Sequence, residues 1–136
     1  MERVDYTDTF ITVAPDCSAV TGTPPPGESV AALSYHLIVQ RPYELRSSDV
    51  IFSVWAARQK IPEDENDSAW AGFYAKPRPC IRSSDLGKRW GWGVHADQDG
   101  RLMVYPIGSA EYQALAAGIA PDGRTVKVRA AMRSTR

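Results

Sequence analysis

The chain has 136 residues, of which 43% are hydrophobic and 24% are charged. This length and composition favour one compact domain over residues 1–136 and exclude a disordered chain. The sequence contains no run of about eighteen apolar residues, which is the length that a membrane-spanning helix needs. The first residues lack the pattern of a secretory signal, and two distant cysteines make no disulfide framework, so we expect a cytoplasmic protein that does not bind membranes.

The charges are unevenly distributed, although 16 basic and 16 acidic residues balance overall. Residues 1–75 carry a net charge of −6 and residues 76–136 a net charge of +6. The last thirteen residues contain five basic residues and no acidic one. Such a segment attracts a small anionic ligand or an acidic protein surface, whereas two halves of opposite sign can also pack together and cancel. The sequence leaves both open, and with them the conformation of the basic C-terminal tail.

The first elements have clear boundaries. Alternating β-branched residues over Thr9–Ala14 predict a strand. The prolines within residues 21–27 predict an extended loop, because they remove backbone donors. Ser29 can cap a helix that Pro42 ends.

The segment Ser48–Arg58 fits two patterns, since its apolar residues recur at helical spacing and also alternate as in a strand. We favour a helix, because Ser48 or Asp49 can cap it, while the strand alternative stays open. Pro62 and the three acidic residues after it predict the start of another helix, with proline in the first helical position. Its inward side would carry Trp70, Phe73 and Tyr74.

The second half predicts a hairpin, a helix and an edge strand. Asp99–Gly100 lies between two alternating segments, and a two-residue turn there would pair Val94 with Tyr105. Ser109 caps a helix through Leu115, and the alternation over Thr125–Arg129 indicates an edge strand. These elements predict an α+β fold with an antiparallel sheet and three to four helices.

A strand over Trp90–Asp97 would have two different faces. Alternation places Trp90 and Trp92 on the core face, which the two-residue turn extends with Met103, Tyr105 and Ile107. The other face would carry Gly91, Gly93 and His95. Two glycines without side chains indicate that something approaches the backbone closely, either a ligand or a helix of the same chain.

Basic residues flank this glycine-lined face. We predict that Arg82, Lys88 and Arg89 hold an anionic group beside Gly91, Gly93 and His95. Basic and aromatic residues also alternate in platforms for single-stranded nucleic acid. That partner is not favoured, because the tryptophans are expected in the core.

Two further functions remain open. Cys80 lies between Arg78 and Arg82, which would lower a thiol pKa, so Cys80 as nucleophile with His95 as base would make a thiol-dependent enzyme. An inert, buried cysteine is the competing interpretation. Exposed Trp55 or Trp70 would instead favour a homodimer. We expect no metal and no cofactor, because the histidines and cysteines lack ligand spacing.

Several segments together resemble a small family of uncharacterised bacterial domains of unknown function. They are Asp8–Cys17, Arg41–Tyr43, Ser48–Phe52, Pro79–Ser83, Lys88–His95, Ser109–Tyr112 and Ala131–Ser134. The most specific is the block Lys-Arg-Trp-Gly-Trp-Gly-Val-His, and the resemblance spans nearly the whole chain. It implies a single compact cytoplasmic domain and no established activity, substrate or cofactor.

Overall fold

The computed structural model describes residues 4–134, which contain five α-helices and four strands. The helices are α1 (Val30–Gln40), α2 (Ser47–Arg58), α3 (Asn66–Tyr74), α4 (Asp85–Lys88) and α5 (Ala110–Ala116). The strands are β1 (Thr9–Thr12), β2 (Trp92–Ala96), β3 (Leu102–Pro106) and β4 (Lys127–Ala130). Two short 3-10 turns, η1 (Glu63–Glu65) and η2 (Ile81–Ser83), precede α3 and α4. None of the helices in this part of the chain has the length and apolar character needed to cross a membrane.

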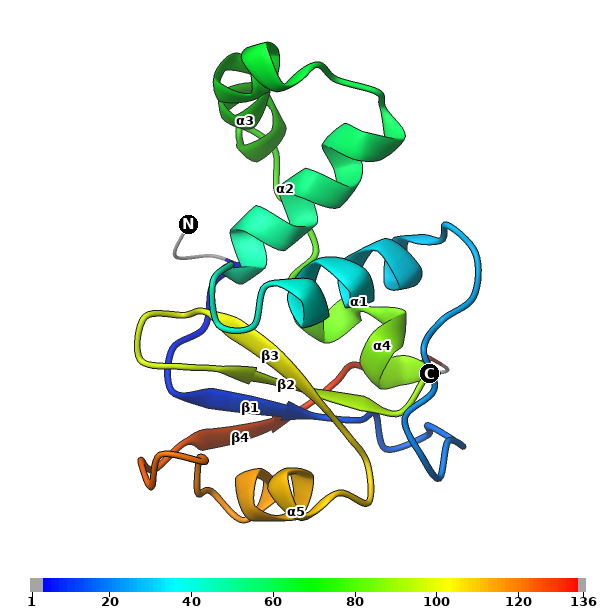
Figure 1. Ribbon diagram of the computed structural model, residues 1–136, viewed down its shortest axis with the longest axis vertical. Helices are drawn as coiled ribbons and strands as arrows, with labels where there is room; N and C mark the ends of the chain where they lie inside the picture. Colours follow the sequence, from blue (N-terminus) through cyan, green and yellow to red (C-terminus); the bar gives the residue numbers. More distant parts are fainter. Residues whose placement is uncertain (1–3, 135–136) are drawn as a thin grey trace.

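The strands form one sheet in the order β3-β2-β1-β4. The α+β prediction is confirmed, but the sheet is mixed, because β4 runs parallel to β1 while the other neighbours are antiparallel. Helices α1 and α4 lie over one face of the sheet and α5 lies over the other, while α2 and α3 extend away from it (Figure 1). β4 is an edge strand, as predicted, with exposed Lys127 and Arg129.

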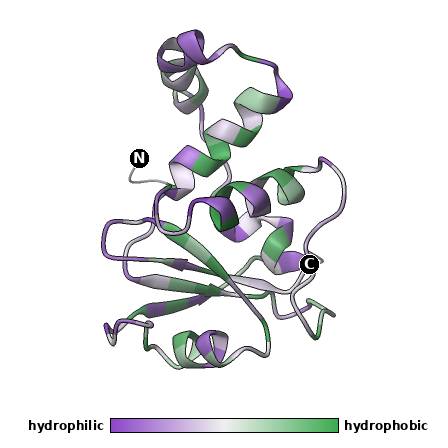
Figure 2. Ribbon diagram, viewed as in Figure 1, coloured by the Kyte–Doolittle hydropathy of each residue, from purple (hydrophilic) through white to green (hydrophobic). Residues whose placement is uncertain are grey.

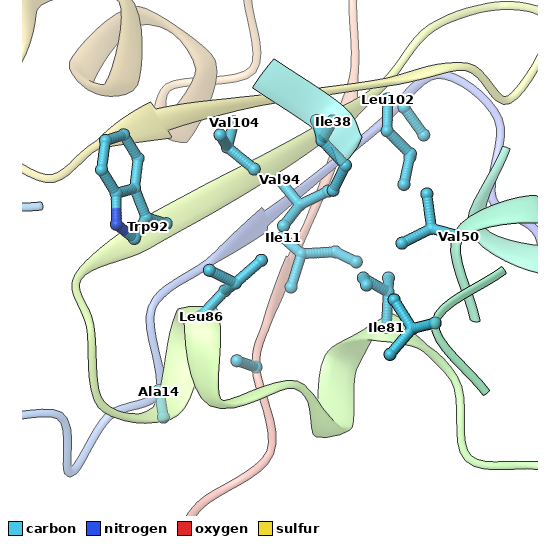
Figure 3. Close-up of a cluster of buried hydrophobic side chains, with 13 residues drawn as sticks. Ile11, Ala14, Ile38, Val50, Ile81, Leu86, Trp92, Val94, Leu102 and Val104 are labelled. Carbon is cyan, nitrogen blue, oxygen red and sulfur yellow. The ribbon is translucent and has the colours of Figure 1, made fainter. Parts of the chain in front are cut away.

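The main core lies between the sheet and the helices above it. Figure 3 shows Ile38 of α1, Val50 of α2 and Leu86 of α4 directed toward the strand residues Ile11 and Val94. All five side chains are at most 3% exposed. Burying a side chain of this size contributes about 1.5–3 kcal/mol each, so this cluster fixes the helices to the sheet.

α2 explains the ambiguous pattern of Ser48–Arg58. Val50 and Val54, four residues apart, pack in the main core, whereas Phe52 and Ala56 pack in a second cluster with α3. A helix buried on two sides has two apolar stripes, and interleaved stripes imitate the alternation of a strand. The favoured helix is therefore confirmed.

The helix starts agree with the predicted caps except at α2 and α3, where Pro62 precedes the 3-10 turn Glu63–Glu65 and the α-helix begins only at Asn66. Ser29 and Ser109 accept backbone N–H groups of their own helices. α2 instead begins after Arg46, whose backbone N–H donates to Oδ2 of Asp49 at 2.9 Å. The expected cap at Ser48 or Asp49 is wrong in position. Asp49 lies inside the helix, and its carboxylate accepts the N–H of Arg46, the residue before the helix.

The hairpin has a different register from the one that a two-residue turn predicts. Asp97 N–H donates to the Arg101 carbonyl oxygen at 2.9 Å, so the loop has three residues and ends at Gly100, which has φ +81°. Val94 therefore pairs with Val104 instead of Tyr105. A shift of one residue reverses the faces of β3, so Leu102 and Val104 join the core and Tyr105 lies on the opposite face.

A smaller aromatic cluster holds α5 against the second face. The rings of Phe10 and Tyr112 meet edge to face with centroids 5.1 Å apart. The Tyr112 hydroxyl accepts the Val13 N–H at 3.0 Å. Figure 2 shows hydrophobic segments in β3 and α5 and hydrophilic segments around the outer end of α3. With α5 on this face and α1 and α4 on the other, both faces of the sheet are covered. His95 pairs with Phe10 and therefore lies on the face that carries α5.

Candidate functional site

The strand predicted over Trp90–Asp97 is shorter in the structure. Gly91 has φ +82°, a left-handed conformation that interrupts the alternation, and the backbone of Thr21 fills the space beside it. Trp92 lies in the core, with Nε1 donating to the Thr23 carbonyl oxygen at 2.9 Å. Trp90 is only partly buried at the core margin, so the two indoles do not share one strand face.

The groove expected over Gly93 is filled by the protein itself. A Cβ at Gly93 would collide with the Phe10 ring and lie 2.7 Å from Cε2 of Tyr112. The glycine thus makes room for the aromatic pair that fixes α5. Of the two explanations for the paired glycines, packing by the same chain applies here.

The basic residues of the predicted anion site do not converge on His95. Nε of Arg82 donates to the Ala130 carbonyl oxygen at 2.9 Å. Lys88 ends α4, and Arg89 is exposed just after it. α4 and α5 lie on opposite faces of the sheet (Figure 1), and His95 shares the face of α5. The anion site built on these residues stays a prediction.

Cys80 borders a cavity of about 280 Å³ on the side of α1 and α2. Its Sγ lies 3.1 Å from the hydroxyl oxygen of Tyr6. Arg78, expected beside the thiol, instead stacks over Phe73 with Cζ 3.9 Å from the ring centroid. His95 lies across the sheet, so the structure does not bring this base and this nucleophile together.

His95 is only 4% exposed and lies at one end of a chain of hydrogen-bonded polar groups. Its Nδ1 lies 2.8 Å from the Tyr43 hydroxyl, which in turn lies 2.7 Å from the Tyr105 hydroxyl. Within residues 4–134, the fully buried side-chain polar atoms without a hydrogen bond belong to Ser47 and Asn66. Nε2 of His95 makes no hydrogen bond in that part of the chain and is not among them, so it is not fully buried.

A cavity of about 200 Å³ opens beside this histidine. Its lining residues are Tyr43, His95, Asp97, Gln98, Pro121 and Asp122. They come from the segment after α1, from β2 and its turn, and from the loop before β4. Two carboxylates, an imidazole, a phenol and an amide border the space, so it offers hydrogen-bond donors and acceptors.

The charge state of His95 follows from burial. Burial lowers the pKa of His95 below its usual 6.5, and the carboxylates of Asp97, Asp122 and Asp8 act in the opposite direction with smaller effect. The imidazole is therefore neutral at pH 7, with one donor nitrogen and one acceptor nitrogen. Burial also raises the pKa of Tyr43 above its usual 10, so its phenol keeps its proton.

Tyr43 has a backbone conformation that few residues with a bulky side chain adopt. Its φ is +56°, and its N–H donates to the Leu102 carbonyl oxygen at 2.9 Å. A left-handed tyrosine stores strain of about 1–3 kcal/mol, and residues of this kind cluster at functional sites. The fold thus holds the Tyr43 phenol against His95 at some expense in stability.

A family model described as a family of unknown function (DUF6157) matches residues 1–136. The chain belongs to this family. No curated protein and no solved structure matches it. DUF6157 membership confirms the resemblance seen in the sequence and assigns no activity. Residues 4–134 hold no group of three or more His, Cys, Asp or Glu side chains placed to bind a metal ion.

For this DUF6157 chain, sequence reasoning identified His95 and missed the residues that surround it. A two-residue turn assigns Tyr105 to the core face, whereas a three-residue loop ending at Gly100 places it beside His95. Tyr43 and Asp122 are distant in sequence from His95 and carry no local signal for the contact. Of the predicted ligand-binding residues, only His95 lines this cavity.

Proposed function

We propose that the protein is a binding domain for a small polar molecule that occupies the cavity beside His95. The observation that carries this proposal is the Nε2 of His95, which is not fully buried although the residue is only 4% exposed. Because this nitrogen is not fully buried, its hydrogen-bond partner comes from the cavity, where a polar group of a ligand can replace water.

Three further features support the proposal. The phenol of Tyr43 fixes the orientation of the imidazole, and the left-handed backbone of Tyr43 is the kind of strain that a binding site retains. The hairpin turn and the loop at Pro121 place polar groups around the opening. These features belong to three separated segments, which is typical of a ligand site.

The other expectations from the sequence stand as predictions beside this one. An anionic partner for Arg82, Lys88, Arg89 and the C-terminal arginines is supported by the charge of the second half. A cytoplasmic location also stays a prediction. So does a homodimer through Trp55 and Trp70, which are partly buried against the α2–α3 cluster.

The test is a fragment screen by ¹⁵N-edited NMR with neutral, cationic and anionic compounds of about four to ten heavy atoms. We expect several fragments to shift the amide signals of Asp97, Gln98 and Asp122 at millimolar concentration. The variant Gln98→Trp, which fills the opening, should abolish these shifts. Gln113→Trp, at an exposed position of α5, is the matched control and should bind like the wild type.

Two outcomes contradict the proposal. One is a screen in which no fragment of any charge perturbs the cavity residues. The other is binding that Gln98→Trp and Gln113→Trp retain equally, because the fragments would then occupy another surface.

A further inference from the structure

The hydrogen bonds of Asp97 and Asp122 leave part of each carboxylate available. Oδ1 of Asp97 accepts the N–H groups of Asp99 and Arg101, both at 2.9 Å. Oδ1 of Asp122 accepts the Arg124 N–H at 3.0 Å. These bonds orient both side chains, while within residues 4–134 Oδ2 of each makes no hydrogen bond. Both carboxylates line the cavity, and each keeps one oxygen without a hydrogen bond in this part of the chain.

The surroundings neutralise these two charges only in part, because the Arg124 charge acts on Asp97 and Asp122 while its guanidinium hydrogen-bonds Asp8. The basic group that acts on this region is Arg124, and its Nε and Nη2 donate to Asp8 at 3.1 and 3.0 Å. Lys127 acts on Asp8 as well. Arg124 is thus bonded to Asp8, and among the described residues no basic side chain forms an ion pair with Asp97 or Asp122, which line the cavity.

The hydrogen bonds from Tyr105 to Tyr43 and from Tyr43 to His95 determine whether His95 presents a donor or an acceptor to a ligand. A phenol is a stronger donor than an imidazole N–H, and an imidazole nitrogen is the stronger acceptor, so the Tyr43 hydroxyl donates to Nδ1. The Tyr105 hydroxyl then donates to the Tyr43 oxygen. The proton of the neutral imidazole consequently lies on Nε2, where the nearby carboxylates favour a positive N–H dipole. His95 therefore presents a donor to the cavity.

We propose that the ligand is a small organic cation, whose ammonium group binds Oδ2 of Asp97 and Asp122 and whose oxygen accepts the Nε2–H of His95. This inference rests on the proposed function, because it names the ligand class of the same cavity. An apolar cavity of about 150 Å³ holds benzene, so about 200 Å³ admits a ligand of about six to ten heavy atoms. Charge complementarity selects an amine with a nearby hydroxyl or carbonyl oxygen over a neutral or anionic compound.

The test compares three compounds of similar size and different charge. Ethanolamine carries an ammonium group and a hydroxyl, ethylene glycol is neutral, and glycolate is anionic. We expect ethanolamine at neutral pH to shift the amide signals of Asp97 and Asp122, and to do so at concentrations about fivefold lower than ethylene glycol, a factor at the upper end of what one exposed ion pair supplies. Glycolate should bind more weakly than either.

Asp122→Asn separates the charge from the shape of the site. The asparagine keeps the oxygen that accepts the Arg124 N–H and loses the negative charge. We expect it to weaken ethanolamine about fivefold and to leave ethylene glycol unchanged. Asp67→Asn, which removes an equally formal charge from the exposed side of α3, should change neither.

The outcomes distinguish this inference from the proposed function. If fragments fill the cavity but ethanolamine has no advantage over ethylene glycol and glycolate, the ligand is not a cation and the inference fails while the binding site stands. If no compound reaches the cavity, both fail. An ethanolamine effect that Asp122→Asn and Asp67→Asn reduce equally also contradicts the inference, because it reflects net charge alone.

Discussion

The cavity beside His95 and the cavity beside Cys80 contain the same kind of pair and differ in what surrounds it. In one, the Tyr43 hydroxyl meets Nδ1 of His95 at 2.8 Å. In the other, the Tyr6 hydroxyl meets Sγ of Cys80 at 3.1 Å. Both pairs join a tyrosine to a potentially reactive side chain beside a cavity, on opposite sides of the sheet. The presence of such a pair therefore does not by itself identify a ligand site.

The difference lies in the polar groups that remain available. Around Cys80 the hydroxyls of Ser34, Ser83 and Ser84 already bond to Val30, Met132 and Leu86. The remaining lining is mainly apolar. Around His95, by contrast, one ring nitrogen and two carboxylate oxygens have no partner in the described chain. Uncommitted hydrogen-bonding capacity, and not the identity of a nucleophile, distinguishes the candidate ligand site.

The largest loss of stability should come from a substitution at Gly93, which packs against α5 on the sheet face that carries His95. Gly93→Ala places a methyl group against Phe10 and Tyr112, so we expect the free energy of unfolding to fall by about 2 kcal/mol or more. Gly72→Ala is the matched control, because nothing lies within 4 Å of its added Cβ in α3. It should raise stability by about 0.5–1 kcal/mol. Urea unfolding measures both, and equal effects would mean that the groove over Gly93 is open.

Tyr43→Phe should have the next largest effect. It removes the group that bonds both His95 and Tyr105, and leaves a buried ring nitrogen without a donor, at a cost of about 1–3 kcal/mol. Tyr105→Phe removes only the outer bond and should cost less. ¹⁵N spectra of the imidazole should show Nε2 protonated in the wild type and a mixture of tautomers in Tyr43→Phe. A wild type already protonated on Nδ1 would contradict the assigned direction of the chain.

The pH dependence of stability tests the burial of His95. Because its pKa in the folded protein lies below the usual 6.5 found when unfolded, the folded state resists protonation. Its contribution is fully present above pH 6.5 and is lost as the pH falls through the folded pKa. His95→Gln should have a flatter profile over this range, whereas His36→Gln at an exposed site of α1 should keep the wild-type slope. Parallel profiles for all three proteins would show that His95 is not buried in solution.

The sequence predicts local elements well where one physical signal acts alone. Ser29 and Ser109 cap the helices that follow them, and Gly100 marks the hairpin. The pattern of α2 is harder to interpret, because its two buried stripes face different partners. Only the presence of α3 on one side and of the sheet on the other explains why Val50 and Phe52 are both buried.

The candidate site depends on contacts that local patterns do not encode. The distinction between a two-residue and a three-residue loop decides whether Tyr105 lies beside His95, and both loops contain the same Asp99–Gly100 pair. Tyr43 reaches His95 across 52 positions of sequence. Its left-handed conformation occurs at a tyrosine and not at a glycine, so the residue type does not predict it.

Tyr6→Phe should have the smallest effect on stability. It tests how far the Tyr6–Cys80 pair differs from the Tyr43–His95 pair. A thiol is a weak hydrogen-bonding group, so loss of the Tyr6 hydroxyl should lower the free energy of unfolding by less than about 1 kcal/mol. Ethanolamine shifts at Asp97 and Asp122 should be unchanged, since the Cys80 cavity lies across the sheet. If Tyr6→Phe is as destabilising as Tyr43→Phe, the two tyrosines hold their partners equally strongly. The strength of the tyrosine bond would then not distinguish the two cavities, and fragment binding would be the measurement that does.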